Sequence, residues 1–306
     1  MKIPFIIIAI IAWTSLTAQS ISTSSGKVIR FENFGSKYVD ARNVDVWLPE
    51  CYDGKTKFSV LYMHDGQMLF DSSSTWNHQE WGVDETLAML MKEKKIRNCI
   101  VVGIWNNGKK RHAEYFPQKA FYGMSQKDQN MILEEQRNLN YYIFSEKPVS
   151  DLYLQFLVKE LKPFIDSAFA TNKETDNTFI AGSSMGGLIS LYAICEYPEV
   201  FGGAACLSTH WTGIYRTYNN PIPSALMDYL TAHLPPPRNH RIYFDFGSET
   251  LDSLYKPFQL QVDEIMKEKG YSSKNWMTKE FPGEDHSEKA WSTRLNIPVV
   301  FLMGKQ

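Results

Sequence analysis

Residues 178–191, TFIAGSSMGGLISL, predict a short buried strand that turns sharply into a helix. Apolar residues open the stretch, and after the turn they recur at the spacing of one helix face. Gly182, Ser184 and Gly186 match G-x-S-x-G, a tight strand-to-helix turn that holds a serine hydroxyl above the sheet. A side chain at either glycine would collide with the neighbouring strand or helix. Because so short a motif can occur by chance, its meaning depends on the rest of the chain.

The remaining chain alternates between strand and helix patterns, which is typical of an α/β fold with a mostly parallel sheet. Residues 106–145 and 213–239 interrupt this alternation; long stretches of this kind are either functional or solvated insertions. We expect strands at 28–34, 43–48, 58–63, 99–104, 178–181, 201–207, 241–246 and 276–281, and helices at 83–95, 152–170, 225–233, 255–269 and from 287 to a stop before Pro298.

The N-terminus has the pattern of a secretory leader. Met1 and Lys2 precede an apolar run over residues 3–13, and the small residue Ala18 follows. A membrane anchor is the alternative, but the run is shorter than the ~20 residues that a bilayer requires. We therefore expect a signal peptide at 1–18, a single domain at 19–306, and export to the periplasm or the extracellular space without membrane contact after cleavage.

Composition excludes several other classes of protein. The chain has 306 residues, 43% of them hydrophobic, which is enough for a sizeable core. Its net charge of −2, with both signs interspersed, does not indicate a nucleic-acid partner. The four cysteines lack zinc spacing, so we expect no metal or other cofactor, and any disulfide pairing stays open. Three of them lie in apolar surroundings and are expected in the core: Cys99, Cys195 and Cys206.

Four histidines follow Ser184, and one lies where a catalytic base is needed. A serine nucleophile requires a base oriented by a carboxylate, and in sheets with this turn the acid precedes the histidine along the chain. His286 follows the last predicted strand, so we assign it as the base. His210 also ends a strand, but no carboxylate loop precedes it, and we expect it to line the pocket. His233 and His240 lie in an insertion and at the wrong end of a strand.

The loop after strand 241–246, with the sequence GSETLD, supplies the candidate acids. Glu249 and Asp252 could each reach an imidazole from this loop. The carboxylate that does not contact the imidazole would be a solvated charge or would cap the helix that follows. These residues by themselves leave both candidates open.

Ester chemistry at a serine also needs donors for the oxyanion. The backbone N–H of Met185 follows the nucleophile at a helix N-terminus, where the dipole favours negative charge. The second donor is expected from the loop after strand 58–63, where Gly66 and Gln67 let the backbone turn inward. We expect the Gln67 N–H to serve, with the Gly66 N–H as second choice.

With these residues in place, the chain resembles the putative-esterase family of α/β-hydrolases. This family includes feruloyl and acetylxylan esterases, enterochelin esterases, formylglutathione hydrolase and mycolyltransferases. The resemblance spans nearly the whole mature domain in order. It rests on LYMHDGQMLFD (61–71), WGVDETL (81–87), IVVGIWN (100–106), RHAEYFP (111–117), AGSSMGG (181–187), LSTHW (207–211), FGSETLD (246–252) and GEDHSEKAW (283–291).

The resemblance implies an α/β-hydrolase fold whose irregular insertions form the pocket, and it implies roles for single residues. Ser184 corresponds to the nucleophile and His286 to the base, and the retained aspartate favours Asp252 over Glu249. The residue after the DG pair supplies an oxyanion amide in relatives, which supports Gln67. Several relatives place their acid where this chain has Thr250. Within the matching segments we expect five substrate-binding residues: Asp65, Trp81, Asn106, His210 and Trp211.

Two functions of different class fit these residues. The first is a secreted serine esterase that acts through an acyl-enzyme on a small-molecule or oligosaccharide ester; the family implies an acylated sugar, a phenolic or a siderophore. Acyl transfer by the same triad differs only in the attacking group. The second is a non-catalytic carbohydrate-binding protein, which predicts a damaged triad, whereas the triad is intact here. Its platform would be Trp76, Trp81, Trp105 and Trp211.

Overall fold

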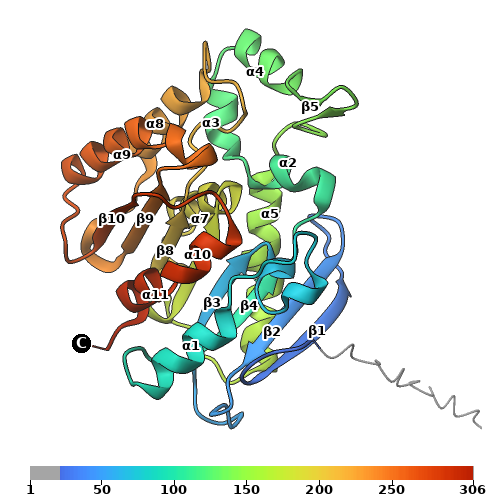
Figure 1. The fold of residues 1–306 in the computed structure, drawn as a ribbon, viewed down its shortest axis with the longest axis vertical. Coiled ribbons are helices and arrows are strands. Elements are labelled where there is room, and N and C mark those ends of the chain that lie inside the picture. Colours follow the sequence, from blue (N-terminus) through green and yellow to red (C-terminus); the bar gives the residue numbers. More distant parts are fainter. Residues whose placement is uncertain (1–20, 306) are drawn as a thin grey trace, which may run out of the picture.

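Eight strands form one central sheet in the computed structural model, which describes residues 21–305 (Figure 1). Six neighbouring strands of this sheet, β4, β3, β7, β8, β9 and β10, run parallel to one another. At one edge, β2 pairs antiparallel with β4 and β1 pairs antiparallel with β2. The predicted parallel sheet is thus confirmed, and the predicted leader lies outside the described residues. In spatial order the strands are β1 (Lys27–Phe34), β2 (Arg42–Leu48), β4 (Cys99–Ile104), β3 (Ser59–His64), β7 (Thr178–Ser183), β8 (Gly203–Leu207), β9 (Arg241–Gly247) and β10 (Trp276–Phe281).

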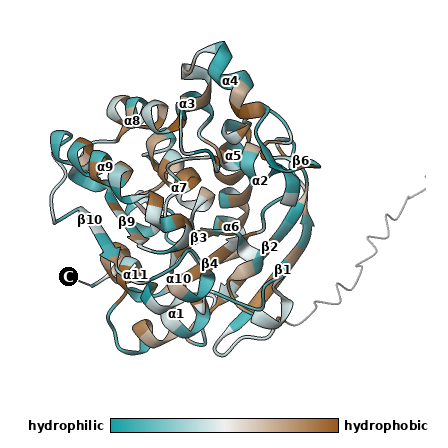
Figure 2. Ribbon diagram, turned by 45° about the horizontal axis from the view of Figure 1, so that its top comes forward, coloured by the Kyte–Doolittle hydropathy of each residue, from teal (hydrophilic) through white to brown (hydrophobic). Residues whose placement is uncertain are grey.

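Helices cover both faces of the sheet, because successive strand residues point to opposite sides and both sides are apolar. Val60 and Tyr62 belong to the core on one face, and Leu61 and Met63 to the core on the other. Figure 2 shows hydrophobic residues on the central strands and on α7, with hydrophilic residues on the outer surfaces. The first face packs α5 (Ser150–Phe156), α6 (Lys162–Ala168), α7 (Met185–Glu196), α8 (Ile222–His233) and α9 (Lys256–Glu268); the second packs α1 (Val83–Lys92), α10 (Glu288–Arg294) and α11 (Asn296–Met303).

The end of the chain differs from the prediction. The closing helix α10 ends at Arg294, before Pro298 as expected, but a second helix that we did not predict, α11, follows and contains this residue. Pro298 lies in the first turn of α11, where its missing N–H would have had no partner within the helix. The chain therefore turns at Leu295 and continues as a second helix.

The insertion at 106–145 is more regular than its sequence suggests. It consists of elements too short to produce a sustained hydrophobic period. Figure 1 shows α4 and β5 projecting from the body of the molecule, above the sheet. The elements are the 3₁₀ helix η3 (Gly108–Lys110), α2 (Arg111–Tyr115), α3 (Gln118–Gly123), α4 (Gln126–Leu133) and the hairpin of β5 (Gln136–Asn138) and β6 (Tyr141–Tyr142).

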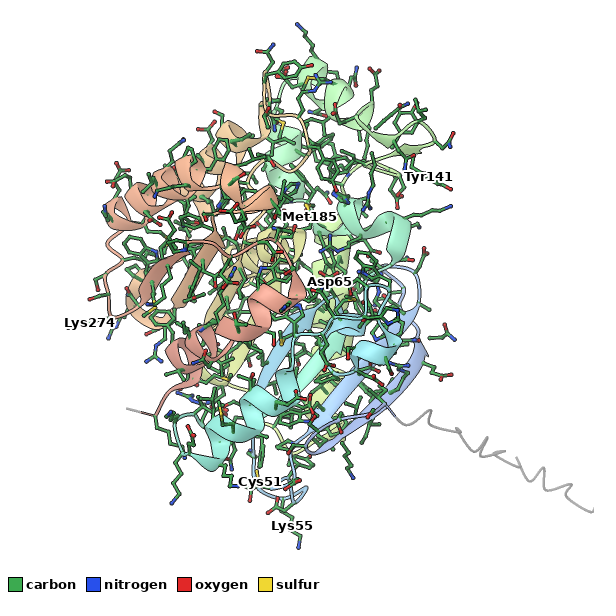
Figure 3. The ribbon with its side chains drawn as sticks, viewed as in Figure 1. Cys51, Lys55, Asp65, Tyr141, Met185 and Lys274 are labelled. Carbon is green, nitrogen blue, oxygen red and sulfur yellow. The ribbon has the colours of Figure 1, made fainter. Side chains whose placement is uncertain are left out.

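All four cysteines are free, and the three expected in the core are buried. Cys51 is exposed and lies at the end of the molecule opposite to Tyr141 (Figure 3). Among the described helices none is both long enough and apolar enough to cross a membrane.

Candidate active site

Ser184 occupies a sharp turn between β7 and α7, as the sequence predicts. Its backbone has φ 57° and ψ −121°, and its N–H still donates to the carbonyl of Leu207 on β8 at 2.9 Å. The turn is so tight that a Cβ on Gly182 would lie 2.8 Å from the carbonyl carbon of Gly186. The glycines therefore allow α7 to begin directly above the sheet, and Ser184 is held at its edge.

The structure brings the carboxylate of Asp252 to the imidazole of His286. The His286 Nδ1 and Asp252 Oδ1 atoms are 2.5 Å apart, and the Asp252 side chain is fully buried. Glu249, the other candidate, is exposed, and its carboxylate accepts a hydrogen bond from the adjacent Ser248 hydroxyl at 3.1 Å. Thr250, which stands where several relatives have their acid, accepts the backbone N–H of His286 at 3.0 Å. This loop thus contacts His286 at both its side chain and its backbone.

The two expected oxyanion donors line the same cleft as Ser184 and His286. Gln67 lies in the 3₁₀ helix η1 (Gly66–Met68), and Met185 is the first residue of α7. Neither backbone N–H has an acceptor among residues 21–305, so both are free to donate to a bound group. The N-terminus of α7 adds the favourable end of its dipole.

The cleft has a volume of about 1020 Å³ and receives most of the predicted substrate-binding residues. Asp65, Trp81, Asn106 and His210 line it, as expected. Trp211 does not. Its side chain is 1% exposed, and its indole N–H donates to Gln259 in the core at 3.1 Å. The LSTHW segment turns back into the protein after His210, so its tryptophan packs inward.

An ion pair that we did not predict joins α2 to the loop after β3. Arg111 of α2 donates two hydrogen bonds to Asp65, each 2.7 Å long, and Asn106 donates a third at 2.7 Å. Burial opposes ionisation of Asp65, but Arg111 holds the pKa of this carboxyl below its usual value. Asp65 therefore ties the arginine to the edge of the sheet near Met185 (Figure 3). Arg111 belongs to the RHAEYFP segment noted in the sequence, but the helix that carries it, α2, is too short to show a helical period.

Two further histidines in the cleft are held neutral. Burial lowers the pKa of His112 to about 3, with Arg111 acting in the same direction. Burial also lowers the pKa of His210, whose Nδ1 lies 2.7 Å from the Tyr255 hydroxyl. Neutral imidazoles here offer hydrogen bonds to a ligand without adding positive charge.

The tryptophans proposed as a carbohydrate platform do not form one surface. Trp76 and Trp81 line the cleft, but Trp105 donates its indole N–H to Asp45 at 2.8 Å, and Trp211 is buried. Among residues 21–305 no group of three or more His, Cys, Asp or Glu side chains is arranged to hold a metal ion.

This architecture defines the class of protein: a mostly parallel sheet between helical layers, with a serine in a strand-to-helix turn, is the α/β-hydrolase fold. Residues 36–299 match the model of the family described as Putative esterase. Because the match covers most of the chain, the protein belongs to this family, and it is an esterase.

A relative from Bacillus subtilis matches most of the chain. The uncharacterized protein YbbA of Bacillus subtilis is 24% identical over 272 residues, which cover 86% of this chain and 93% of YbbA.

Solved structures of similar fold have low sequence identity and therefore support the fold alone. An IroE-like serine hydrolase from Shewanella oneidensis has a TM-score of 0.67 at 19% identity, covering 90% of this chain and 80% of that one. A ferulic acid esterase has a TM-score of 0.61 at 17% identity, covering 90% and 98%. The enterobactin esterase from Shigella flexneri has a TM-score of 0.61 at 18% identity, covering 94% of this chain but only 61% of its own.

Proposed function

We propose that this esterase is an exported serine carboxylic-ester hydrolase with Ser184 as nucleophile. The observation that carries the proposal is the 2.5 Å contact between Asp252 and His286 in the cleft that Ser184 lines. Serine is a weak nucleophile by itself, and a histidine oriented by a buried carboxylate is the usual means of activating it.

In the acylation step, Nε2 of His286 takes the proton of the Ser184 hydroxyl while Oγ attacks the ester carbonyl carbon. Asp252 accepts the Nδ1–H of His286, so it fixes the tautomer that leaves Nε2 free and stabilises the imidazolium. The N–H groups of Gln67 and Met185 donate to the oxyanion of the tetrahedral intermediate. The C–O bond to the alcohol then breaks, and the alcohol leaves with the proton from His286.

In the deacylation step, a water molecule replaces the alcohol. His286 takes one proton from the water, and the resulting oxygen attacks the carbonyl carbon of the acyl-enzyme. The same two N–H groups hold the second oxyanion. The bond between the carbonyl carbon and Oγ then breaks, Ser184 recovers its proton from His286, and the carboxylic acid is released.

Replacing the nucleophile tests this mechanism. We expect Ser184→Ala to lower kcat for p-nitrophenyl acetate at least about 10³-fold, because no acyl-enzyme can form. A fluorophosphonate should add to the wild-type protein at Ser184 and not to the variant, as read by mass spectrometry of peptides. The control is Ser59→Ala, which removes a buried serine hydroxyl at the start of β3, the end of this strand away from the cleft. Turnover in Ser184→Ala equal to that of the wild type would disprove the assignment.

For the substrate we propose an ester of a sugar, a phenolic acid or a siderophore. Exposed aromatic rings support a planar or sugar-like partner, since Trp76, Tyr141, Tyr142 and Tyr215 all lie at the cleft and are 83%, 54%, 56% and 47% exposed. Similar structures include a ferulic acid esterase and an enterobactin esterase, which adds support by analogy.

A parallel screen discriminates among these substrates. Methyl ferulate, acetylated xylan and a catecholate siderophore ester should be offered at equal ester concentration, and one should give kcat/KM at least about tenfold above p-nitrophenyl acetate, because remote contacts contribute to catalysis. Inactivity on all three with p-nitrophenyl acetate still cleaved would contradict the proposed substrate class.

We also propose export by cleavage near Ala18, which the composition of residues 1–18 supports. Expression of the full chain in a bacterial host should yield a mature protein that begins at or near residue 19. N-terminal sequencing of the protein recovered outside the cytoplasm checks this, and a chain that retains Met1 inside the cell argues against it.

A further inference from the structure

The second oxygen of the Asp252 carboxylate has its own partners, and none of them was expected from the sequence. Oδ2 accepts the Ser208 hydroxyl at 2.5 Å and the Gly247 N–H at 2.6 Å. Ser208 is the first residue after β8 and is completely buried. Its backbone N–H donates to the carbonyl of Asp245 on β9 at 2.8 Å, so its position follows from the sheet.

The direction of the Ser208 hydroxyl follows from the chemistry of its other neighbours. Trp291 Nε1 donates to Ser208 Oγ at 2.9 Å, and Arg294 Nη2 donates to it at 3.0 Å. An indole N–H and a guanidinium can only donate, whereas a hydroxyl has one proton and two lone pairs. Both lone pairs are therefore occupied, and the single proton can point only at Oδ2 of Asp252. That oxygen must then be an acceptor.

We propose that Ser208 is a positioning residue that holds Asp252 in the orientation in which Oδ1 accepts the Nδ1–H of His286. This inference rests on the proposed function of the triad. Ser208 and Gly247 hold Oδ2 in place by hydrogen bonds, so the carboxylate of Asp252 cannot rotate away from His286. Trp291 and Arg294 in turn keep the hydroxyl proton of Ser208 directed at Asp252.

The donors to Ser208 are themselves held by the surrounding structure. Arg294 is 2% exposed and also donates to both oxygens of Asp245, at 3.1 and 3.3 Å. The Trp291 ring stands edge-on to the His286 ring, with centroids 5.0 Å apart. The same tryptophan thus contacts the base through its ring and Ser208 through its N–H.

Removal of the hydroxyl should affect turnover more than binding. Ser208 does not line the cleft, so Ser208→Ala should leave KM within about twofold, while kcat falls about 10- to 100-fold, the range known for residues that orient metal ligands through a hydrogen bond. The proton spectrum provides a second readout. The wild type should show a low-field resonance of the His286 Nδ1–H that is absent in His286→Ala, and Ser208→Ala should shift or lose it.

Ser59→Ala is the matched control, because this buried serine also donates to a side chain, Asn177 at 2.8 Å, but far from the triad. It should alter neither kcat nor the low-field resonance. Trp291→Phe keeps the aromatic ring and removes one donor to Ser208, so it should give a smaller loss of kcat; this variant serves where Ser208→Ala does not fold.

Wild-type kcat and an unchanged resonance in folded Ser208→Ala would overturn the inference while the triad itself stood. Unchanged kcat in Trp291→Phe would overturn it where only that variant can be measured. If Ser184→Ala also keeps its activity, the proposed function fails first, so the two failures are distinguishable.

Discussion

Four residues at the site hold positive φ angles without being glycine, which few non-glycine residues do. Such conformations cost of order 1–3 kcal/mol each and persist only where the surrounding structure imposes them. Each residue directly follows, or lies in the loop after, the carboxyl end of a parallel strand that contributes to the site. They are Asp65 (57°), Ser184 (57°), Ser208 (41°) and Thr250 (52°). They are four of the eight non-glycine residues with positive φ among residues 21–305.

The choice of acid can be tested at the level of one residue. Asp252→Asn should lower kcat about 10³- to 10⁴-fold, because an amide can donate to Nδ1 and so favour the wrong tautomer of His286. Glu249→Gln should stay within about twofold of wild type, since this exposed carboxylate does not contact His286. Steady-state kinetics on p-nitrophenyl acetate compares them. A larger loss in Glu249→Gln would reverse the assignment.

Single elements of the fold position the two proposed oxyanion donors, Gln67 and Met185. The 3₁₀ helix η1 lies so close to β4 that a Cβ on Gly66 would be 2.5 Å from the carbonyl carbon of Gly103. On the other side, α7 is buried almost all round and begins at Met185. Two backbone segments packed against the sheet therefore place residues with unpaired N–H groups at one cleft.

A methyl group at Gly66 should displace this donor. Gly66→Ala meets backbone atoms that cannot rotate away, so η1 must shift and move the Gln67 N–H. We expect kcat to fall about 10²- to 10³-fold, the usual effect of losing one oxyanion donor, with a smaller change in KM.

Gly123→Ala is the matched control for this substitution, because a Cβ there meets no atom within 4 Å. It should keep wild-type kcat. Equal kinetics for both alanine variants would show that the Gln67 N–H is not a donor.

At the scale of the whole molecule, the site forms where the strand order reverses. The chain passes from β3 to β4 on one side and then crosses back to β7 on the other. Loops after β3 and β7 consequently diverge, and such a point at the carboxyl edge of a parallel sheet leaves a crevice. The loops after β9 and β10 then bring Asp252 and His286 to the same edge. This topology thus brings Gln67 and His286, which are more than 200 positions apart in the chain, to one cleft.

Stability should depend on pH through a carboxyl that joins the N-terminal segment to α1. Asp84 accepts the N–H groups of Ser24 and Ser25 at 2.7 and 3.2 Å, and burial together with Glu85 raises its pKa to about 6. Between pH 4 and 6 the folded chain therefore keeps a proton that the unfolded chain has lost. The free energy of unfolding from this group falls as pH rises through that window and is level above it.

Asp84→Asn removes this titration. The free energy of unfolding of the variant minus that of the wild type should rise by about 1–2 kcal/mol from pH 4 to pH 7. Urea denaturation at each pH measures both values. Glu268→Gln, at the exposed end of α9, should run parallel to wild type. A constant difference between Asp84→Asn and wild type across this range would refute the expectation.

Much of the fold could be predicted because the buried central strands are short apolar runs and the long helices have a hydrophobic period. β4 and β10 were predicted with their observed bounds, whereas α2 to α4 were missed because none is long enough to repeat a pattern. Trp211 was misplaced because the sequence shows that a residue follows a strand but not which way its side chain turns. The catalytic roles of Ser184, His286 and Asp252 remain predictions, although the structure brings Asp252 and His286 together.

The sequence by itself determined the order of strand, turn and helix around Ser184, and the order in which a carboxylate loop and a histidine loop follow it. These features are local, or depend only on chain order, so short-range physics and topology suffice to predict them. The tertiary structure alone decided that Asp252 contacts His286 while Glu249 is exposed, that Arg111 pairs with Asp65, and that Ser208 fixes the far oxygen of Asp252. Each depends on which side chains of distant strands meet at one sheet edge, and no local pattern in the chain encodes that contact.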